Sequence, residues 1–389
     1  MTKDNINQDN EEQPIIIEKE FNDPIKFLEY LDPLAQINDD TEKEERKRAG
    51  VFVQINDDTT EGKKENADDA LSKLRNGRWS HKKDNSPGKE LTDVLFRGQP
   101  GDYDLIPGVF RDDFLLVDSH DAYLDKSNSG LVKSLKFLLN REHGQLNKFY
   151  KACDNKGIAL IGDSLNIREN FDNRIFQIDG VMTTYHFHWP STSYLQHLIA
   201  AQHHGCKTRI LDWTSQSFIA AYFAASEANK KSQELELKKE KLKQSVNSEK
   251  EVLKQDGKEK YIVVWALFDG NDEDKSHNSL QIVRNIPGSI SQNLALQSGA
   301  ITYHLIHCDH KEKEKIYNKK AINKVKESNV KLLYKVKLEN TKDNITTLLF
   351  CLRKYGFRGS SLFKDFEGVK REMEFDDISW ISKRDRSNA

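Results

Sequence analysis

The sequence has little of what would tie a protein to a membrane or to a polyanion. Its 60 basic and 62 acidic residues leave a formal net charge of -2, so bulk charge gives no general attraction to nucleic acid or anionic lipid. No apolar run approaches the roughly 18–20 residues that span a bilayer, and residues 1–14 contain no apolar signal core. We therefore expect a cytoplasmic protein without a membrane partner.

Cysteine is scarce too. The chain has four cysteines, far apart and without a CxxC pair: Cys153, Cys206, Cys308 and Cys351. This spacing indicates neither a zinc site nor a redox pair, so we expect small buried side chains. Histidines gather at residues 185–188 and 203–204, yet no carboxylate or cysteine completes a ligand set at a known spacing. We expect no metal.

Apolar residues are also few. Only 37% of residues are hydrophobic, 31% are charged and the mean hydropathy is -0.75, so part of the chain must be solvated helix or lack a packed core. The hexamer QINDDT occurs twice before residue 60, which is too little for a repeat architecture. We predict a polar, partly disordered N-terminal region over 1–90, with a flexible tail over 1–20, a short helix near 23–34 and a loosely ordered connector over 36–90.

Strand and helix patterns interleave from Leu91 onward, without regular βαβ spacing or a GxGxxG phosphate loop. We therefore predict an α+β fold with a mixed or antiparallel sheet, in a domain over 91–380. The sequence predicts strands near 94–96, 208–213, 261–268, 301–307 and 331–338. Helices are predicted over 130–152 with an interruption at Gly144, over 192–204 with Gly205 as the stop, from residue 216, over 344–357 and after Gly359.

The helix predicted from residue 216 changes character along its length. It is apolar at Phe218, Ile219 and Tyr222, and then almost wholly charged through about Lys254. Opposite charges four residues apart support a helix there, but the segment has little to bury. We predict a charged helical insertion over about 229–259 that projects into solvent.

Arg97 stands where a predicted strand gives way to a turn at Gly98. A planar fork of donors at a sheet edge suits a phosphate or carboxylate ligand. An arginine that bonds loop carbonyls is the structural alternative, and the tripeptide alone leaves both open. His203 and His204 end a predicted helix, where the helix dipole favours a cation, so we expect raised histidine pKa values.

Asp212 ends a short predicted strand and has two interpretations: it caps the next helix, or it stays ionised near Arg97. Residues three apart on an extended chain face opposite sides, so a pair between Arg209 and Asp212 is not assured. The hydroxyls of Thr214 and Ser215 are expected to cap the helix that follows.

The order of these pieces carries more information than each piece alone. LFRGQ at 95–99, LIP at 105–107 and FR at 110–111 are followed by QHHG at 202–205, TRILDWT at 208–214, AYFA at 221–224, QSGAIT at 297–302 and GSSLFKDFEG at 359–368. This series resembles the FRG domain family of bacterial and phage proteins. The resemblance covers about Leu91 to Glu374 and is interrupted by the charged insertion.

The motif order of this family is similar to that of ADP-ribosyltransferase-like folds, which implies a split sheet with flanking helices and NAD as the substrate. By this resemblance Arg97 holds the NAD pyrophosphate or ribose, and Gln297 stands at the late-strand position of a glutamate. The implied catalytic residues are Arg97, His204, Asp212, Thr214 and Gln297. The implied cofactor-binding residues are Arg97, Gly98, Gln99, Gln202, His203, Thr208, Arg209, Trp213, Ser215 and Tyr222, with Ser215 and Thr214 at the nicotinamide-side ribose and the Tyr222 helix packed beneath.

Cleavage of the nicotinamide–ribose bond passes through an oxocarbenium-like transition state, which a nearby carboxylate stabilises. Gln297 can bond a hydroxyl but supplies no negative charge, and loss of one such group costs about 10²–10³ in rate. Asp212 or Glu227 could provide the carboxylate if either one faces the same cleft. Otherwise the fold keeps a nucleotide pocket without catalysis.

The favoured function is an intracellular ADP-ribosyltransferase or NAD-consuming effector, with a toxin or anti-phage role and a protein or nucleic-acid acceptor. One alternative is a nucleotide- or nucleic-acid-binding module without chemistry. Another is a scaffold that binds a protein partner through the 229–259 helix. A nuclease is disfavoured, because the sequence has no recognisable HNH, HKD or paired-carboxylate arrangement.

Overall fold

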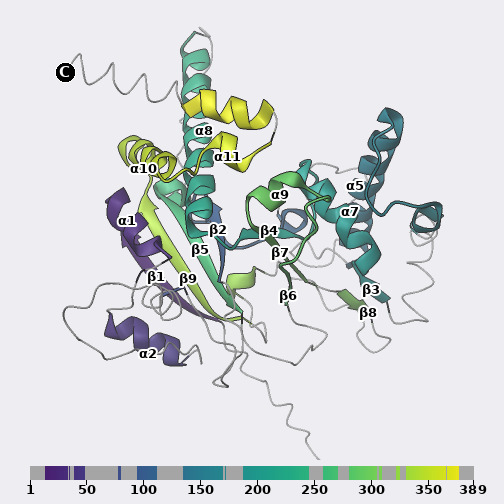
Figure 1. Cartoon of the computed structure of the whole chain (residues 1–389), viewed down its shortest axis with the longest axis horizontal. Helices are drawn as coiled ribbons and strands as arrows, with labels where there is room; N and C mark the ends of the chain where they lie inside the picture. Colours follow the sequence, from purple (N-terminus) through teal and green to yellow (C-terminus); the bar gives the residue numbers. More distant parts are fainter. Residues whose placement is uncertain are drawn as a thin grey trace, which may run out of the picture.

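The structure is a computed structural model that describes residues 14–33, 35, 39–48, 78–79, 94–111, 135–169, 171, 187–244, 257–269, 280–304, 306–308, 321–324, 330–364 and 366–375. Within these residues the fold is α+β, as the sequence predicts, with a mixed seven-stranded sheet at its centre (Figure 1). No helix in the described ranges is long and apolar enough to cross a membrane.

The sheet has the strand order β1-β9-β5-β2-β4-β7-β6. Strand β1 runs parallel to β9, and the other neighbours are antiparallel. The strands are β1 (Ile15–Phe21), β2 (Leu95–Gln99), β4 (Leu211–Thr214), β5 (Tyr261–Asp269), β6 (Leu280–Val283), β7 (Gly299–His304) and β9 (Val330–Glu339). The short strands β3 (Phe187–Trp189) and β8 (Ile306–Cys308) form a separate antiparallel pair. The predicted strands over 261–268, 301–307 and 331–338 are thus confirmed as β5, β7 with β8, and β9.

Strand β2 joins the two halves of the sheet unequally. It pairs with β5 at five positions, from Leu95 to Gln99, but with β4 only through Phe96 and Thr214. Strand β4 in turn pairs with β7 at four positions. The sheet therefore divides beside Arg97, and the division leaves room for a ligand between β2 and β4.

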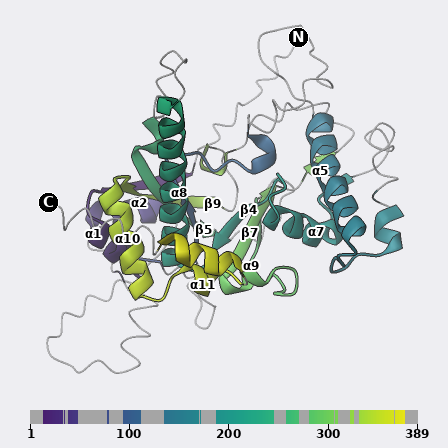
Figure 2. The same ribbon diagram turned by 90° about the horizontal axis from the view of Figure 1, so that it is seen from above.

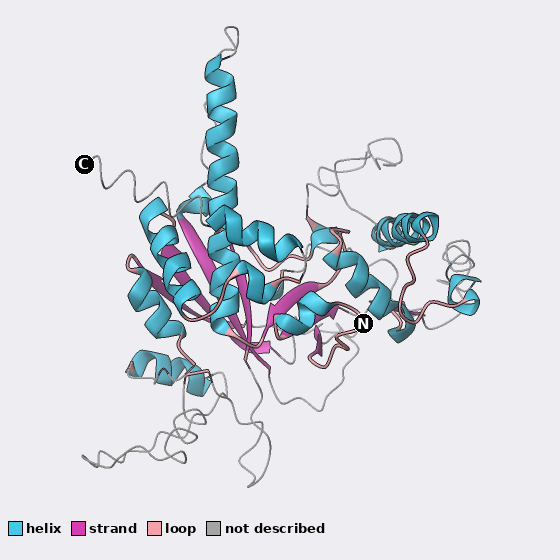
Figure 3. Cartoon of the chain, turned by 45° about the horizontal axis from the view of Figure 1, so that its top comes forward, coloured by secondary structure: helices cyan, strands magenta, loops and turns pink. Residues whose placement is uncertain are grey.

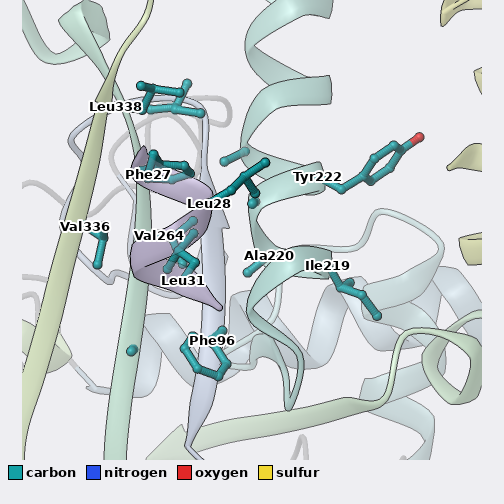
Figure 4. Close-up of a cluster of buried hydrophobic side chains, with 14 of the residues drawn as sticks. Phe27, Leu28, Leu31, Phe96, Ile219, Ala220, Tyr222, Val264, Val336 and Leu338 are labelled. Carbon is teal, nitrogen blue, oxygen red and sulfur yellow. The ribbon is translucent and has the colours of Figure 1, made fainter. Parts of the chain in front are cut away.

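Three helices cover one face of the sheet, as Figures 1 and 2 show: α1 (Pro24–Leu31), α8 (Ser217–Gln244) and α10 (Lys342–Lys354). In Figure 4 the apolar side chains of α1 lie between the strands and α8. Asp23 caps α1 and Thr341 caps α10, each through a side-chain oxygen that accepts from a backbone N–H. Burial of this apolar layer is the main stabilising contribution on this face.

The glycine of the FRG tripeptide is required by helix packing. A Cβ on Gly98 would lie 1.9 Å from the carbonyl oxygen of Ala220 and 2.8 Å from the backbone nitrogen of Ala224. Small alanines on α8 and a glycine on β2 together let the helix backbone approach the strand. This contact fixes the depth of α8 beside Arg97.

A second group of helices packs beside the β4–β7–β6 half of the sheet. It contains α5 (Leu135–Lys156) and α7 (Thr192–His203), whose core includes Tyr150, Trp189 and Leu198. The expected interruption at Gly144 is wrong, because α5 continues through it. One glycine costs a helix about 1 kcal/mol, and the buried side chains on either side of it outweigh that cost. The helix predicted to end at Gly205 is confirmed, with Gly205 at φ +86°.

The expected flexible tail is wrong for residues 15–20, which belong to β1. Seven residues of β1 pair in register with β9, and Glu18 and Glu20 form ion pairs with Lys335 and Lys337 on that strand. The partner strand β9 lies more than 300 residues away in the sequence, so no local sequence pattern predicts this pairing. The helix predicted near 23–34 corresponds in position to α1.

The expected loosely ordered connector is also wrong in part. Residues Asp40–Arg48 form helix α2, and its Arg46 is buried against Tyr334 of β9. Glu42 of α2 accepts from Tyr334 Oη at 2.8 Å and pairs with Arg78 Nε at 3.0 Å. Glu42 and Arg78 are paired, and Arg46 donates to Tyr334 Oη and to the Arg78 carbonyl, which is what allows these charges to lie in the core. Residues 39–41 of the first QINDDT hexamer are described, and the rest of both hexamers lies outside the described residues.

Helix α8 continues far beyond the sheet, and Figure 3 shows its distal half projecting from the body of the molecule. Ala228 is the last buried residue in the part of α8 up to Lys239, and from Glu234 to Lys239 the side chains are mostly exposed. The charged sequence and the exposure agree, since few groups there can be buried. Residues 245–256 of the predicted insertion lie outside the described residues.

Candidate functional site

A cavity of about 910 Å³ opens at the division between β2 and β4. One wall is formed by β2 and the loop after it, and another by β4 and the end of α7. The first turns of α8, the helix α9 (Gln292–Leu296) and residues 363–371 complete it. Of the residues implied by the family resemblance, the cavity is lined by Arg97, Gly98, Gln99, Gln202, His203, Asp212, Trp213, Thr214 and Gln297. Three distant segments thus meet at one hollow.

Arg97 is half-buried and enters this cavity from β2. Its Nη1 donates to the backbone carbonyl of Asp212 at 2.6 Å, while its buried Nε has no hydrogen-bond partner in the described part of the chain. Burial lowers the pKa of Arg97 to about 10, the charge of Asp212 opposes that change, and the charge of Arg111 adds to it. The side chain remains a cation at pH 7, with a donor left for a ligand.

Asp212 lies beside Arg97 and does not cap α8. Its Oδ2 accepts from Gln202 Nε2 at 3.2 Å, and Gln202 Oε1 in turn accepts from Thr208 Oγ1 at 2.7 Å. The chain Thr208, Gln202 and Asp212 therefore orients the carboxylate toward the cavity wall. The helix-entry bond is made by Thr214, whose hydroxyl accepts from the backbone nitrogen of Gln216 at 3.1 Å. Gln216 precedes α8 and its carbonyl accepts the first helical bond, so the Thr214 bond forms the turn before the helix and the expected capping by Thr214 is not confirmed.

His203 ends α7 against the cavity, and its pKa is lowered, whereas the helix dipole had predicted a raised value. Burial is the largest cause, the charge of Asp212 works in the opposite direction, and the neighbouring His204 adds to the lowering. The desolvation of a half-buried imidazole outweighs the partial charge of the helix end. His203 is therefore a neutral side chain at pH 7, and its Nε2 is buried without a partner among the described residues.

Thr214 and Gln297 are joined to each other. The Thr214 hydroxyl donates to the backbone carbonyl of Gln297 at 2.7 Å, and Gln297 Nε2 donates to the carbonyl of Leu362 at 3.0 Å. Gln297 is the C-cap of α9 and precedes β7 by two residues, so it does not lie on the strand itself. Its amide nitrogen fastens α9 to the helix α11 (Gly359–Leu362), which leaves Oε1 and the second N–H of Nε2 for a ligand.

Five of the implied residues do not line the cavity: His204, Thr208, Arg209, Ser215 and Tyr222. His204 is exposed and its ring stacks on Phe149 at 6.0 Å. Tyr222 is buried on the side of α8 away from α1 in Figure 4, where it lines a small pocket with Phe357 and Glu372, and Ser215 is exposed. For these residues the structure gives packing, capping or surface positions in place of the implied contacts with a cofactor.

Arg209 is the clearest correction. Its side chain is fully buried, and its Nε and Nη2 lie 2.7 and 2.6 Å from Glu142 Oε2 on α5. Glu142 also accepts from the backbone nitrogen of Arg209 and from Trp189 Nε1. This ion pair joins α5 to the chain entering β4, so Arg209 pairs neither with Asp212 nor with a ligand. Sequence spacing gave no signal for Glu142.

Several cavity residues were not nominated from the sequence. Arg111, Lys231 and Lys258 bring positive charge, and Asp104 and Glu367 bring negative charge. Aromatic and long basic side chains of the wall complete the group: Tyr103, Phe110, Phe223, Phe363 and Arg371. Arg111 stands in the FR pair of the motif series, which was its available signal. Phe363 and Glu367 stand in the GSSLFKDFEG motif of the same series, whereas Arg371 lies beyond it.

Glu227, considered from the sequence as a carboxylate source, does line the cavity. It lies on α8 and forms no hydrogen bond or ion pair within the described ranges, while Asp212 lies on β4. Two carboxylates on different walls thus face the same hollow as Arg97. Among the described residues, no group of three or more His, Cys, Asp or Glu side chains is placed to hold a metal ion. Tyr185 and His186 lie outside those residues.

Residues 92–233 match the family model of the FRG domain. The chain contains an FRG domain. The matched segment begins just before β2 and ends within α8, so it includes Arg97, Asp212 and Glu227. It excludes Gln297 and the wall at 363–371, which belong to the rest of the same fold. No curated protein and no solved structure matches the chain.

Proposed function

We propose that this FRG-domain protein is an intracellular, NAD-dependent ADP-ribosyltransferase-like effector. The observation that carries the proposal is the meeting of Arg97, Asp212 and Thr214 at one cavity between two adjacent, splayed strands. An arginine on the first strand and a hydroxyl at the end of the second, just ahead of a helix, are the features that the family resemblance implies. The proposal includes a toxic or anti-phage role and a protein or nucleic-acid acceptor.

The cavity suits a nucleotide in its chemistry. The buried, unpartnered Nε of Arg97 fits a phosphate oxygen, since a planar guanidinium binds phosphate through charge-assisted hydrogen bonds. Phe223 and Phe363 line the cavity and pack edge to face at 5.8 Å, which gives an apolar wall for a ring. When bound, NAD supplies a nicotinamide–ribose bond whose cleavage develops positive charge on the ribose.

Gln297 has no carboxylate to stabilise that positive charge. Asp212 and Glu227 are the two cavity residues that can supply one. Asp212 is held by Gln202 and lies beside a guanidinium, which offsets part of its charge. Glu227 has no partner in the described part of the chain, so its charge is available to a ligand in the cavity. We assign transition-state stabilisation to Glu227 and the orientation of Arg97 to Asp212.

The test is release of nicotinamide from labelled NAD in the presence of cellular extract. Wild type should release it, and Arg97→Ala and Glu227→Gln should each lower the rate by about 10²–10³. Asp212→Asn should lower the rate less, because the backbone carbonyl of this residue still accepts the hydrogen bond from Arg97 Nη1. The exposed Arg48→Gln variant is the charge-matched control. Full activity in Arg97→Ala would remove that residue from the mechanism.

A nucleotide-binding module without chemistry is the second candidate. It is favoured by the bond from Gln297 Nε2 to Leu362, which gives the residue at the glutamate position a structural part. This candidate predicts saturable nucleotide binding, no release of nicotinamide and no effect of Glu227→Gln on affinity. A measured turnover that depends on Glu227 would eliminate it.

A further inference from the structure

Arg111 follows the 3-10 helix η1 (Gly108–Phe110), at the end of the loop that leaves β2. Its Nε donates to the carbonyl of Ile106 at 3.0 Å, and the backbone of η1 is tied to the chain before β4 by Val109 N–H and the carbonyl of Thr208 at 3.1 Å. The side chain is half-buried and lines the cavity together with Arg97. Arg111 is therefore positioned by the fold and does not depend on a ligand for its placement.

Neither guanidinium has a carboxylate partner within the described residues. Arg97 bonds a neutral carbonyl, and so does Arg111. The Asp212 carboxylate accepts from Gln202, while Asp104 is paired with Lys324 at 2.7 Å. The two cations repel each other, and the charge of Asp212 compensates Arg97 only in part, so an anion between the two guanidinium groups is stabilised by both.

The lysines at the cavity are less suited to this task. Lys231 Nζ lies 3.2 Å from Tyr103 Oη and 3.5 Å from Glu259 Oε1, so its charge is already shared. Lys258 is exposed. Arg371 Nε donates to Glu367 Oε1 at 2.8 Å, so its charge is also shared, and Arg97 and Arg111 are the half-buried cavity cations of the described residues that bond only neutral groups.

We propose that Arg97 and Arg111 together clamp a pyrophosphate group, so that the cavity selects nucleoside diphosphates and dinucleotides over nucleoside monophosphates. One phosphate satisfies one guanidinium fork, and two adjacent phosphates are needed to satisfy both. This deepens the proposed function by giving Arg111 a part in substrate selection, and it rests on that function only for the identity of the dinucleotide. Binding without turnover tests it separately.

The experiment measures binding of ADP, AMP, inorganic pyrophosphate and inorganic phosphate to the full chain by calorimetry at low salt. Wild type should bind ADP and pyrophosphate more tightly than AMP and phosphate. Arg111→Gln should lose about 10- to 100-fold in affinity for ADP and pyrophosphate, the loss expected for one charged hydrogen-bonding partner, and little for AMP. Arg97→Gln should weaken all four ligands.

Arg111→Lys keeps the charge but not the fork, so it should lose part of the preference for two phosphates. If Arg111→Gln does not fold, Arg111→Lys tests the clamp in its place. Arg48→Gln controls for the change in net charge. Equal affinity of wild type for AMP and ADP, or wild-type ADP affinity in folded Arg111→Gln and Arg111→Lys, would overturn the clamp. If nicotinamide release is absent while the ADP preference depends on Arg111, the clamp stands and the transferase does not. If release occurs while Arg111 has no effect on ADP binding, only the clamp fails.

Discussion

Arg97 and Arg209 lie near neighbouring strands of one fold, yet their burial and their hydrogen-bond partners differ. Arg209 is fully buried and held by Glu142, whose carboxylate accepts hydrogen bonds from the backbone N–H of Arg209 and from its guanidinium. Arg97 is half-buried, bonds a carbonyl, and keeps an unpartnered Nε at the wall of a 910 Å³ cavity. A buried charge needs a partner. Glu142 is that partner for Arg209, which is therefore structural, and we propose that a ligand is the partner of Arg97.

The largest expected effect comes from removing the Glu142 carboxylate that pairs with Arg209. Glu142→Gln should lower the free energy of unfolding by about 3–5 kcal/mol, because it leaves the Arg209 charge uncompensated in the core. Urea unfolding followed by circular dichroism measures this. Glu44→Gln, at an exposed position of α2, is the matched control and should change stability little. An unchanged midpoint in Glu142→Gln would show that the pair does not support the fold.

The contact that holds α8 beside Arg97 should give the next largest effect. Gly98→Ala should cost about 1–3 kcal/mol, since the new methyl group meets backbone atoms of α8 that cannot move aside. Gly144→Ala is its control, because a Cβ there meets nothing within 4 Å and the helix should gain about 1 kcal/mol. Thermal unfolding compares them. A destabilisation of the same size in both variants would contradict the close-packing account.

Replacing the unpaired arginine should change stability least among these substitutions. Arg97→Gln should shift the unfolding free energy by about 1 kcal/mol or less, because one hydrogen bond to a carbonyl is lost while a desolvated charge is removed. The same urea titration measures it, in the absence of nucleotide. A loss as large as that of Glu142→Gln would place Arg97 with Arg209 among the structural residues.

The smallest expected effect is a change in how the free energy of unfolding depends on pH in the acid range. Burial lowers the folded-state pKa of His203 below 6.5, so the unfolded state binds the proton more readily. Its contribution to stability is fully present above about pH 6.5 and is lost as the pH falls toward the folded pKa. His203→Gln should therefore reduce the dependence of unfolding free energy on pH below 6.5. Identical slopes for wild type and variant between pH 7.5 and 5.5 would contradict this.

The sequence predicted the wall of the site better than its chemistry. Arg97, Asp212 and Thr214 could be nominated because a strand, a turn glycine and a helix start are local patterns. Glu142 could not, because it belongs to a helix joined to Arg209 only by folding. The same holds for β1, whose partner strand is β9, and for residues 363–371, which reach the cavity from the far end of the chain. Non-local pairing has no signature in a single sequence.

The lowered pKa of His203 was missed for a related reason. The helix end is visible in the sequence, but the burial that outweighs it comes from packing against β4 and the cavity wall. Gln297 shows the reverse case. Its amide identity raised a doubt about catalysis, and the structure gives that amide a bond to Leu362.

The most direct test of the account is a structure of the protein determined with ADP or a non-hydrolysable NAD analogue. The account predicts phosphate oxygens within hydrogen-bond distance of Arg97 Nε and of the Arg111 guanidinium, with Arg209 still on Glu142. A nucleotide bound elsewhere, or one bound in the cavity while Arg97 Nε stays without a partner, would contradict it.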